Sequence, residues 1–262
     1  FMHIVAAGWA MTSLTDSPTL VGLVQTSWAV PGFVLALHAG AFADMVDRKK
    51  LIFVTQIAAL AIAVALSVLD VTGNLGVTTL LAGTFLESVA LTIAAPAFMA
   101  LTPQLVGTQY LSQAFGLDSV SRNIAQSVGP ALAGAIIAFT SAGAVFMLNA
   151  VSFVGILIVC RKLPTMSAQA EKMSKINRVI KDGIGHVVRT AQLRNIAVRL
   201  ALVFASTASL IAVMPIVAKE SLGVSAGGFG LLSGALGAGS VGAVWLLPIL
   251  RKKCQPELLA VI

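Results

Sequence analysis

The sequence is poor in charged residues. Only 10% of its 262 residues are Asp, Glu, Lys or Arg, whereas 58% are hydrophobic. A soluble domain carries about 25% charged residues, which keep its surface hydrated. This scarcity excludes a soluble enzyme, a nucleic-acid-binding module and a disordered protein. The chain is therefore predicted to be an integral membrane protein.

Residues for covalent, metal or nucleotide chemistry are also scarce. The two cysteines, Cys160 and Cys254, lie far apart, so no disulfide framework is expected. The sequence contains no metal-ligand spacing, no glycine-rich phosphate loop and no nucleophile–base motif. We therefore expect no cofactor, no metal site and no catalytic residue, and we do not expect an enzyme.

Long apolar runs occupy most of the chain. A bilayer core about 30 Å thick requires roughly 20 apolar residues per helix. Runs of about this length lie near residues 19–43, 51–70, 76–100, 112–139, 144–160, 196–218 and 227–250. A shorter run covers residues 1–14, and another begins at Leu258. The sequence thus predicts an all-α polytopic membrane protein, and we expect a fragment that begins within helix 1 and ends within helix 9.

Basic residues are confined to alternate connections. They follow the runs at residues 19–43, 144–160 and 227–250, with Arg122 and Lys219 as exceptions. The positive-inside rule places these connections, and the N-terminus of the full-length chain, in the cytoplasm. The longest connection has apolar residues at helical spacing among basic ones, which predicts an amphipathic helix on the membrane surface near residues 173–187. The net charge of +7 therefore encodes topology and does not indicate a nucleic-acid partner.

The runs divide the chain into two units. Residues 1–160 are predicted to form an N-terminal six-helix bundle with an incomplete first helix. Residues 161–195 are predicted to be a cytoplasmic linker, and residues 196–262 the beginning of a second bundle. Each unit contains a polar turn, a glycine-rich helix and a basic triplet in the same order. Two six-helix bundles related by such a repeat are a recurrent transporter plan, with the substrate site between them.

The most specific motif follows the run at residues 19–43. Residues 40–50 read Gly-Ala-Phe-Ala-Asp-Met-Val-Asp-Arg-Lys-Lys. The segment resembles the signature of the major facilitator superfamily between its second and third helices, G-x-L-A-D-R-x-G-R-K. The resemblance implies a motif that latches one conformation of the carrier, and a simple topology determinant is the alternative. The matching residues are Gly40, Ala43, Asp44, Arg48 and Lys49.

A second motif lies in the run at residues 112–139. Residues 127–134 read Ser-Val-Gly-Pro-Ala-Leu-Ala-Gly. Proline in a membrane helix removes a backbone hydrogen bond, and small residues allow a neighbouring helix to approach closely. The segment resembles the antiporter motif of the superfamily, G-P-x-x-G-G, at Gly129, Pro130 and Gly134. That resemblance implies a proton-coupled exporter, and helix packing alone is the alternative.

A single acid lies deep within an apolar run. Glu87 shares a helical face with small residues at spacings of three and four, so we expect it to face protein or a cavity. An ionisable residue inside a membrane is costly and marks a functional site by default. We expect Glu87 to handle a proton or the substrate, and a structural hydrogen bond is the alternative. The small residues on this face are Gly83, Ala90, Ala94 and Ala97.

Three further polar residues share a face with Gly129. Asp118, Arg122 and Gln126 recur at spacings of four. An acid and an arginine four residues apart neutralise each other on a helix. Alternatively, Arg122 binds an anionic substrate or balances Glu87.

The motifs together resemble the major facilitator superfamily over most of the chain, and most closely the bacterial branch of enterobactin-exporter-like and multidrug efflux proteins. This resemblance implies a monomeric carrier in the bacterial inner membrane. It would export a small amphipathic molecule, such as a drug or a siderophore, in exchange for protons by alternating access. Without a nucleotide-binding segment, an ion gradient would supply the energy. The alternatives are a proton-coupled importer of a nutrient and a non-transporting membrane protein or truncated remnant.

Overall fold

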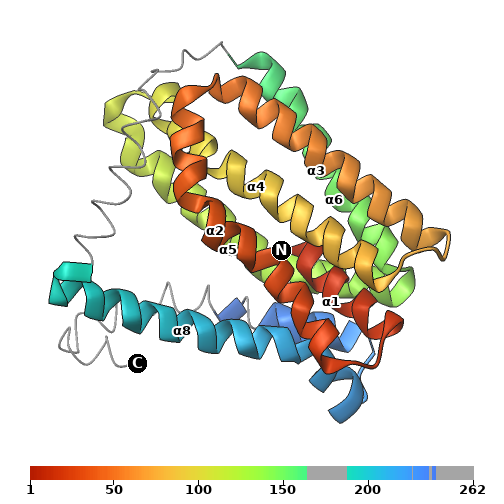
Figure 1. The fold of residues 1–262 in the computed structure, drawn as a ribbon. Coiled ribbons are helices and arrows are strands. Elements are labelled where there is room, and N and C mark those ends of the chain that lie inside the picture. The colour runs from red at the N-terminus through yellow and green to blue at the C-terminus, as the bar shows by residue number, and fades with distance from the viewer. Residues whose placement is uncertain (164–187, 226, 236–237, 240–262) are drawn as a thin grey trace.

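The computed structural model describes residues 1–163, 188–225, 227–235 and 238–239. Within these ranges every regular element is a helix, so the predicted all-α fold is confirmed (Figure 1). A 3-10 helix, η1 (Thr108–Tyr110), precedes α5, and a π-helix, η2 (Val217–Ser221), follows α8. The α-helices are α1 (Met2–Leu14), α2 (Pro18–Met45), α3 (Arg48–Val71), α4 (Val77–Leu105), α5 (Leu111–Phe139), α6 (Ala142–Lys162) and α8 (Ala191–Ile216).

The helices follow the apolar runs of the sequence. Five of the described helices are long and apolar enough to cross a membrane, judged by length and composition. α1 has 13 residues and is shorter than a membrane span. The predicted amphipathic helix near residues 173–187 lies outside the described residues. The five segments are Pro18–Ala36, Arg48–Val71, Val77–Leu105, Ala142–Lys162 and Ala191–Ser221.

Small residues bring the middle helices close together. α3 lies beside α4 and α6, and α2 lies beside α4 (Figure 1). Ala59 and Ala63 of α3, Ala90 of α4 and Ala150 of α6 are buried against one another around Phe153. In a membrane, where lipid is as apolar as leucine, such small residues favour helix association by allowing close backbone packing.

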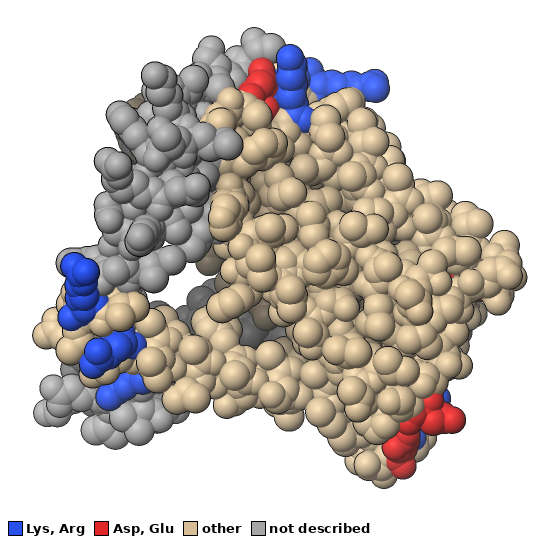
Figure 2. All heavy atoms as spheres, in the orientation of Figure 1, with Lys and Arg blue, Asp and Glu red and all other residues tan. Residues whose placement is uncertain are grey.

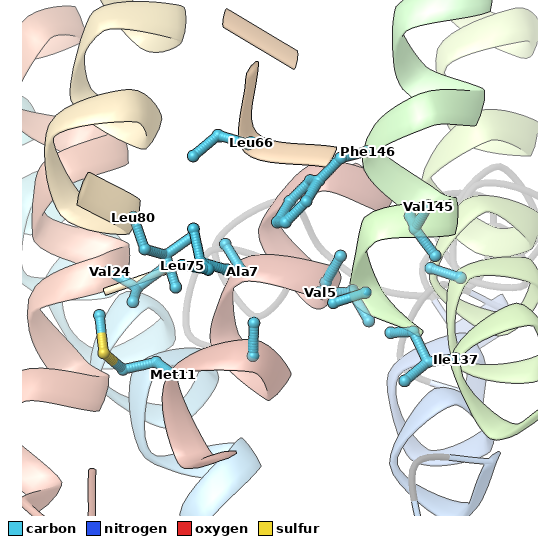
Figure 3. Packing of buried hydrophobic residues seen from close by; sticks show 14 of the residues in the cluster. Val5, Ala7, Met11, Val24, Leu66, Leu75, Leu80, Ile137, Val145 and Phe146 are labelled. Atoms are coloured by element: carbon cyan, nitrogen blue, oxygen red, sulfur yellow. The ribbon is translucent and has the colours of Figure 1, made fainter. Parts of the chain in front are cut away.

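The short helix α1 lies at the centre of the packing. It contacts α2, α4, α5, α6 and α8. Figure 3 shows its apolar side chains among those of the surrounding helices, with Val5 near Ile137 and Met11 near Val24. Phe146 of α6 is fully buried in the same cluster. Most of α1 is therefore buried against protein, whereas Ser13 is exposed.

Two polar contacts join the end of α3 to the start of α6. Ser67 Oγ donates to the carbonyl of Gly143 at 2.8 Å, and the amide of Gly143 donates to Asp70 Oδ2 at 2.6 Å. Amide groups in the first turn of a helix have no partner within that helix. Asp70 therefore serves as the acceptor for the first turn of α6.

Replacing Asp70 with Ala is expected to destabilise the protein by about 1–2 kcal/mol, as loss of a helix cap does. The amide of Gly143 would lose its acceptor in a poorly hydrated position. Thermal unfolding of the purified complete protein in detergent measures the loss as a lower midpoint. The matched control is Asp16→Ala, at an exposed acid between α1 and α2. Equal midpoints for the two variants would contradict the role assigned to Asp70.

α8 approaches the other helices through its C-terminal end. Residues 191–207 are exposed in the structure described, whereas Pro215 and Ala218 are buried. Figure 1 shows α8 diverging from α2 toward its first residues. Within the described residues, α8 and η2 therefore meet the preceding helices near the C-terminal end of α8.

α1 makes three of the contacts at this meeting. A Cβ atom built on Gly8 would lie 3.2 Å from Pro215 Cγ, so α1 and α8 are in close contact there. The rings of Trp9 and Phe229 stack with centroids 5.7 Å apart. Lys219 Nζ donates to the carbonyl of Thr12, in the last turn of α1. A cation at this position also complements the negative end of the α1 dipole.

Charged side chains lie at the margins of the face shown in Figure 2, and a broad uncharged surface separates them. The basic residues Arg48, Lys49 and Lys50 begin α3, and Arg161 and Lys162 end α6. Helix ends rich in Lys and Arg with uncharged walls between them are typical of a polytopic membrane protein.

Candidate functional site

Glu87 is buried where α4 faces α1 and α6. Its side chain is 1% exposed. Ala90, Ala94 and Ala97, on the same face of α4, are also buried. The predicted orientation of Glu87 toward protein is therefore confirmed, whereas its functional role stays a prediction.

Both carboxylate oxygens of Glu87 face polar groups from other helices. Oε1 accepts a hydrogen bond of 2.8 Å from Asn149 Nδ2 on α6. Oε2 lies 3.2 Å from His3 Nδ1 on α1, within ion-pair distance but without the alignment of a hydrogen bond. His3 Nε2 in turn lies 3.3 Å from Thr84 Oγ1, one turn before Glu87 on α4.

Aromatic rings enclose the imidazole of His3, which is 2% exposed. Trp28 of α2 stacks on it with centroids 5.5 Å apart and planes 25° apart, and Phe146 lies 5.2 Å away at 45°. The carbonyl of Trp28 accepts a 2.5 Å hydrogen bond from Ser88 Oγ. Four helices thus meet at one polar centre, which we call the Glu87 cluster: His3, Trp28, Thr84, Glu87 and Asn149.

A cavity of about 360 Å³ lies beside the Glu87 cluster. Trp28 belongs to both, because it lines the cavity and stacks on His3. The cavity wall comes from α1, α2, α5, α8 and the helical residues 227–235, and it combines apolar side chains with the amides of Gln25 and Gln126. Its volume is within the range of small-molecule sites, about 300–1,000 Å³.

The glycine–proline motif of α5 lies at this cavity and at the meeting of the two units. Gly129, Pro130 and Gly134 are buried, and Pro130 lines the cavity. A Cβ atom on Gly129 would lie 3.5 Å from Met2 Cγ of α1. Proline in the middle of α5 also removes one backbone donor from the helix beside the cavity.

The helical residues 227–235 pack on α5 through glycine. A Cβ atom built on Gly230 would lie only 2.4 Å from Gly134 Cα, so the two backbones touch. One turn on, a Cβ atom on Gly234 would lie 2.7 Å from the Cβ of Ala131. One turn earlier, the same atom on Gly227 would lie 3.3 Å from the Cβ of Ala138.

Asp118 and Arg122 form an exposed ion pair. Nε and Nη2 of Arg122 donate to Asp118 Oδ2 at 2.9 and 2.7 Å, and the side chains are 48% and 66% exposed for Asp118 and Arg122. Within the part of the chain described, Arg122 pairs with Asp118 and not with Glu87. The pair lines a second cavity of about 340 Å³ together with Phe98 of α4 and Cys160 of α6.

The motif at residues 40–50 forms the junction of α2 and α3. Ala43 is buried beside Leu51 and Cys160, and a Cβ atom on Gly40 would meet nothing within 4 Å. The side chain of Asp44 lies outside the part of the chain that the structure describes. Asp47 caps α3 by accepting from the amide of Lys50 at 3.0 Å.

Two basic residues of this motif follow the cap. Arg48 is the first residue of α3. Lys49 Nζ donates to the carbonyl of Arg161 at 3.2 Å and to that of Leu163, where α6 ends. The motif therefore ties the α2–α3 junction to the end of α6, and its role as a conformational latch stays a prediction.

Replacing Lys49 with Met is expected to destabilise the protein by about 1 kcal/mol, because the last carbonyls of α6 lose a charged donor. Lys50→Met is the matched control, since Lys50 is exposed and the contacts with the end of α6 are made by Lys49. Thermal unfolding in detergent compares the two variants. A loss of equal size in both would assign the effect to surface charge instead of the α6 terminus.

Sequence reasoning identified Glu87 but not its partners. Asn149 is an amide within the apolar run at residues 144–160, and such a polar residue is a signal that could have found it. His3 carries the same kind of signal, as an ionisable residue within the apolar run at residues 1–14. Trp28 carries none, because its approach to His3 depends on how α2 packs.

Comparison with known proteins shows the family. The whole chain, residues 1–262, matches a major facilitator family described as "Transmembrane secretion effector". It is 29% identical over 232 residues to an uncharacterised MFS-type transporter of Sinorhizobium fredii, covering 87% of this chain and 57% of that protein. It is 22% identical over 249 residues to the Staphyloferrin A transporter of Staphylococcus aureus, covering 95% of this chain and 63% of that protein.

A third relative is an uncharacterised MFS-type transporter of Bacillus subtilis, 30% identical over 154 residues, which are 58% of this chain and 36% of that protein. The chain thus spans 57% and 63% of the length of the first two relatives. These relatives are transporters and not enzymes, as expected from the sequence, while the enterobactin-exporter-like branch stays a prediction. The match over residues 1–262 shows that the chain belongs to the major facilitator superfamily, in its transmembrane secretion effector family.

Proposed function

We propose that the complete protein is a secondary active transporter that exports a small amphipathic molecule in exchange for protons. The observation that carries this proposal is the position of Glu87. It is buried to 1% exposure in a cluster that shares Trp28 with a cavity of about 360 Å³. A membrane-buried acid beside a ligand-sized cavity allows proton binding and substrate binding to influence each other.

The contacts between the two units support alternating access. They gather at the end of α1 that holds Thr12, opposite the basic residues at the α2–α3 junction. We infer a six-helix bundle at residues 1–160, a linker at 161–195 and the start of a second bundle at 196–262. The cavity would open toward the basic, cytoplasmic side of the bacterial inner membrane.

Two observations support export of an amphipathic molecule. The family description refers to secretion, and Pro130 of the antiporter-like motif lines the cavity. The cavity wall offers aromatic and aliphatic surface together with the amides of Gln25 and Gln126. Such a wall suits a drug-like molecule or a siderophore, and one relative is the Staphyloferrin A transporter. We expect the carrier to act as a monomer.

Flux in everted membrane vesicles tests the proposal. Vesicles from cells that express the complete gene are given an acid lumen and then either ethidium or staphyloferrin A. An exporter accumulates its substrate in the lumen, and a protonophore abolishes the accumulation. Export of substrate from preloaded vesicles under the same gradient would instead show an importer. Flux of both probes equal to that of vesicles without the protein would count against export of these two classes.

A further inference from the structure

His3 is the group at Glu87 that can change its hydrogen-bonding role. Asn149 Nδ2 can only donate to the carboxylate. The imidazole of His3 carries one nitrogen 3.2 Å from Glu87 Oε2 and the other 3.3 Å from the hydroxyl of Thr84, which both donates and accepts. When the His3–Glu87 pair binds a proton, the Thr84 hydroxyl can therefore change from donor to acceptor.

Two protonation states fit the same set of contacts. In the first, Glu87 is ionised, His3 Nδ1–H points to Oε2, and Nε2 accepts from the Thr84 hydroxyl. In the second, which holds one proton more, one proton lies between Oε2 and Nδ1 and the other is on Nε2, which donates to Thr84 Oγ1. The pair changes its net charge from −1 to 0, whereas Asn149 donates to Oε1 in both states. Oε2 and Nδ1 have no aligned hydrogen bond in the structure, so a small rotation across their 3.2 Å separation is needed to partner both atoms in a poorly hydrated interior.

We propose that His3 and Glu87 form one proton-binding site, with the transported proton shared between Nδ1 and Oε2. This inference rests on the proposed function, since it names the second residue of the same site. His3 is then a proton-binding residue in its own right and not only a neighbour that positions the carboxylate.

Five other charged side chains of the surrounding helices have partners away from Glu87. On α3, Asp70 accepts from the amide of Gly143, and Lys49 donates to the end of α6. On α5, Asp118 pairs with Arg122. Lys219 of η2 donates to the carbonyl of Thr12. The α-amino group of Phe1 also acts electrostatically on Glu87 and His3. Among the side chains described, His3 is the one at ion-pair distance from Glu87 that can carry positive charge.

The position of His3 also gives the proton a route to conformational change. His3 lies on α1, whose later residues Gly8, Trp9 and Thr12 contact the second unit. The same helix lines the cavity through Ile4 and Val5. Protonation that alters the His3–Glu87 contact between α1 and α4 therefore acts on a helix that lines the cavity and also contacts the second unit.

Two titrations of the purified complete protein in detergent test the shared site. Nitrogen NMR of histidine-labelled protein follows the tautomer and charge of His3, and the signal is assigned by its loss in His3→Gln. Infrared spectroscopy follows the protonated carboxyl of Glu87, assigned by its loss in Glu87→Gln. We expect both signals to change with a common midpoint in the wild type. Each substitution should move the midpoint of the other group by about one pH unit or more, as coupled sites require.

The matched control is His38→Gln, which makes the same chemical change at an exposed histidine on α2 and should move neither midpoint. A Glu87 midpoint that is unchanged in His3→Gln would overturn the proposal and leave His3 as a structural partner. A His3 signal that does not titrate while Glu87 does would overturn it as well. The titrations use no substrate, so their outcome is independent of whether vesicles transport ethidium or staphyloferrin A.

Discussion

Replacing Glu87 with Gln is expected to reduce proton-driven accumulation in everted vesicles to the level of vesicles without the protein. Gln has the shape of Glu and can keep the 2.8 Å contact with Asn149 through its carbonyl oxygen. It cannot bind a proton, so substrate movement is no longer linked to the pH gradient. Downhill movement of the same probe is expected to continue, because Glu87 itself does not line the cavity.

The comparison variant is Glu220→Gln, which removes an exposed carboxylate from η2. It should accumulate the probe at the wild-type rate. Wild-type accumulation by Glu87→Gln would show that coupling does not use this carboxylate. In that case Glu87 would have only the structural role given as its alternative, and another group would carry the proton.

Replacing Gly230 with Ala is expected to open the contact between the two units. The new Cβ atom would lie 2.4 Å from Gly134 Cα and 3.1 Å from two further backbone atoms of that residue. A backbone cannot yield as a flexible side chain does, so the helical residues 227–235 must move away from α5. Overpacking of this kind costs about 1–3 kcal/mol. An equilibrium between closed and open forms would then shift by roughly 5–150-fold.

Labelling of a cysteine measures this shift. Val21 lines the cavity and also lies near Thr12 and Lys219, at the end where the units meet. A Val21→Cys variant in a complete protein without its other cysteines is treated on whole cells with an impermeant maleimide. The labelling rate should rise when Gly230→Ala is added. Gly116→Ala on α5 is the control, because a Cβ atom there would meet nothing within 4 Å. Equal rates in both backgrounds would show that the Gly134–Gly230 contact does not close this end.

The positions of the helices were predictable because a membrane helix depends on local composition. The run at residues 51–70 corresponds to α3 (Arg48–Val71), and the run at 112–139 to α5 (Leu111–Phe139). Helix ends differ by a few residues because polar caps such as Asp47 extend the helix beyond its apolar segment. Five of the described helices have the length and composition of a membrane span, and α5, predicted as a span from the run at 112–139, is not among them.

The site was predictable only in part. The burial of Glu87 followed from its spacing with Ala90 and Ala94, which is a property of one helix. Its contacts with His3 and Asn149 join residues far apart in the sequence, and no local pattern encodes which helices meet. The same holds for Gly230, whose significance depends on the backbone of Gly134 lying opposite. The burial of the acid was thus predictable from one helix, whereas its polar contacts depend on how the helices pack.

The brevity of the connections at one end of the molecule affects how the protein can be probed. Residues 15–17 join α1 to α2, residues 72–76 join α3 to α4, and residues 140–141 join α5 to α6. Antibodies and proteases need a protruding flexible segment, and these turns offer little chain to bind or cleave. An epitope tag on this side would best be inserted next to Gly73, an exposed residue with a φ of 72° in the longest of the three turns. In the proposed orientation, a tag in that turn would be detected on intact cells.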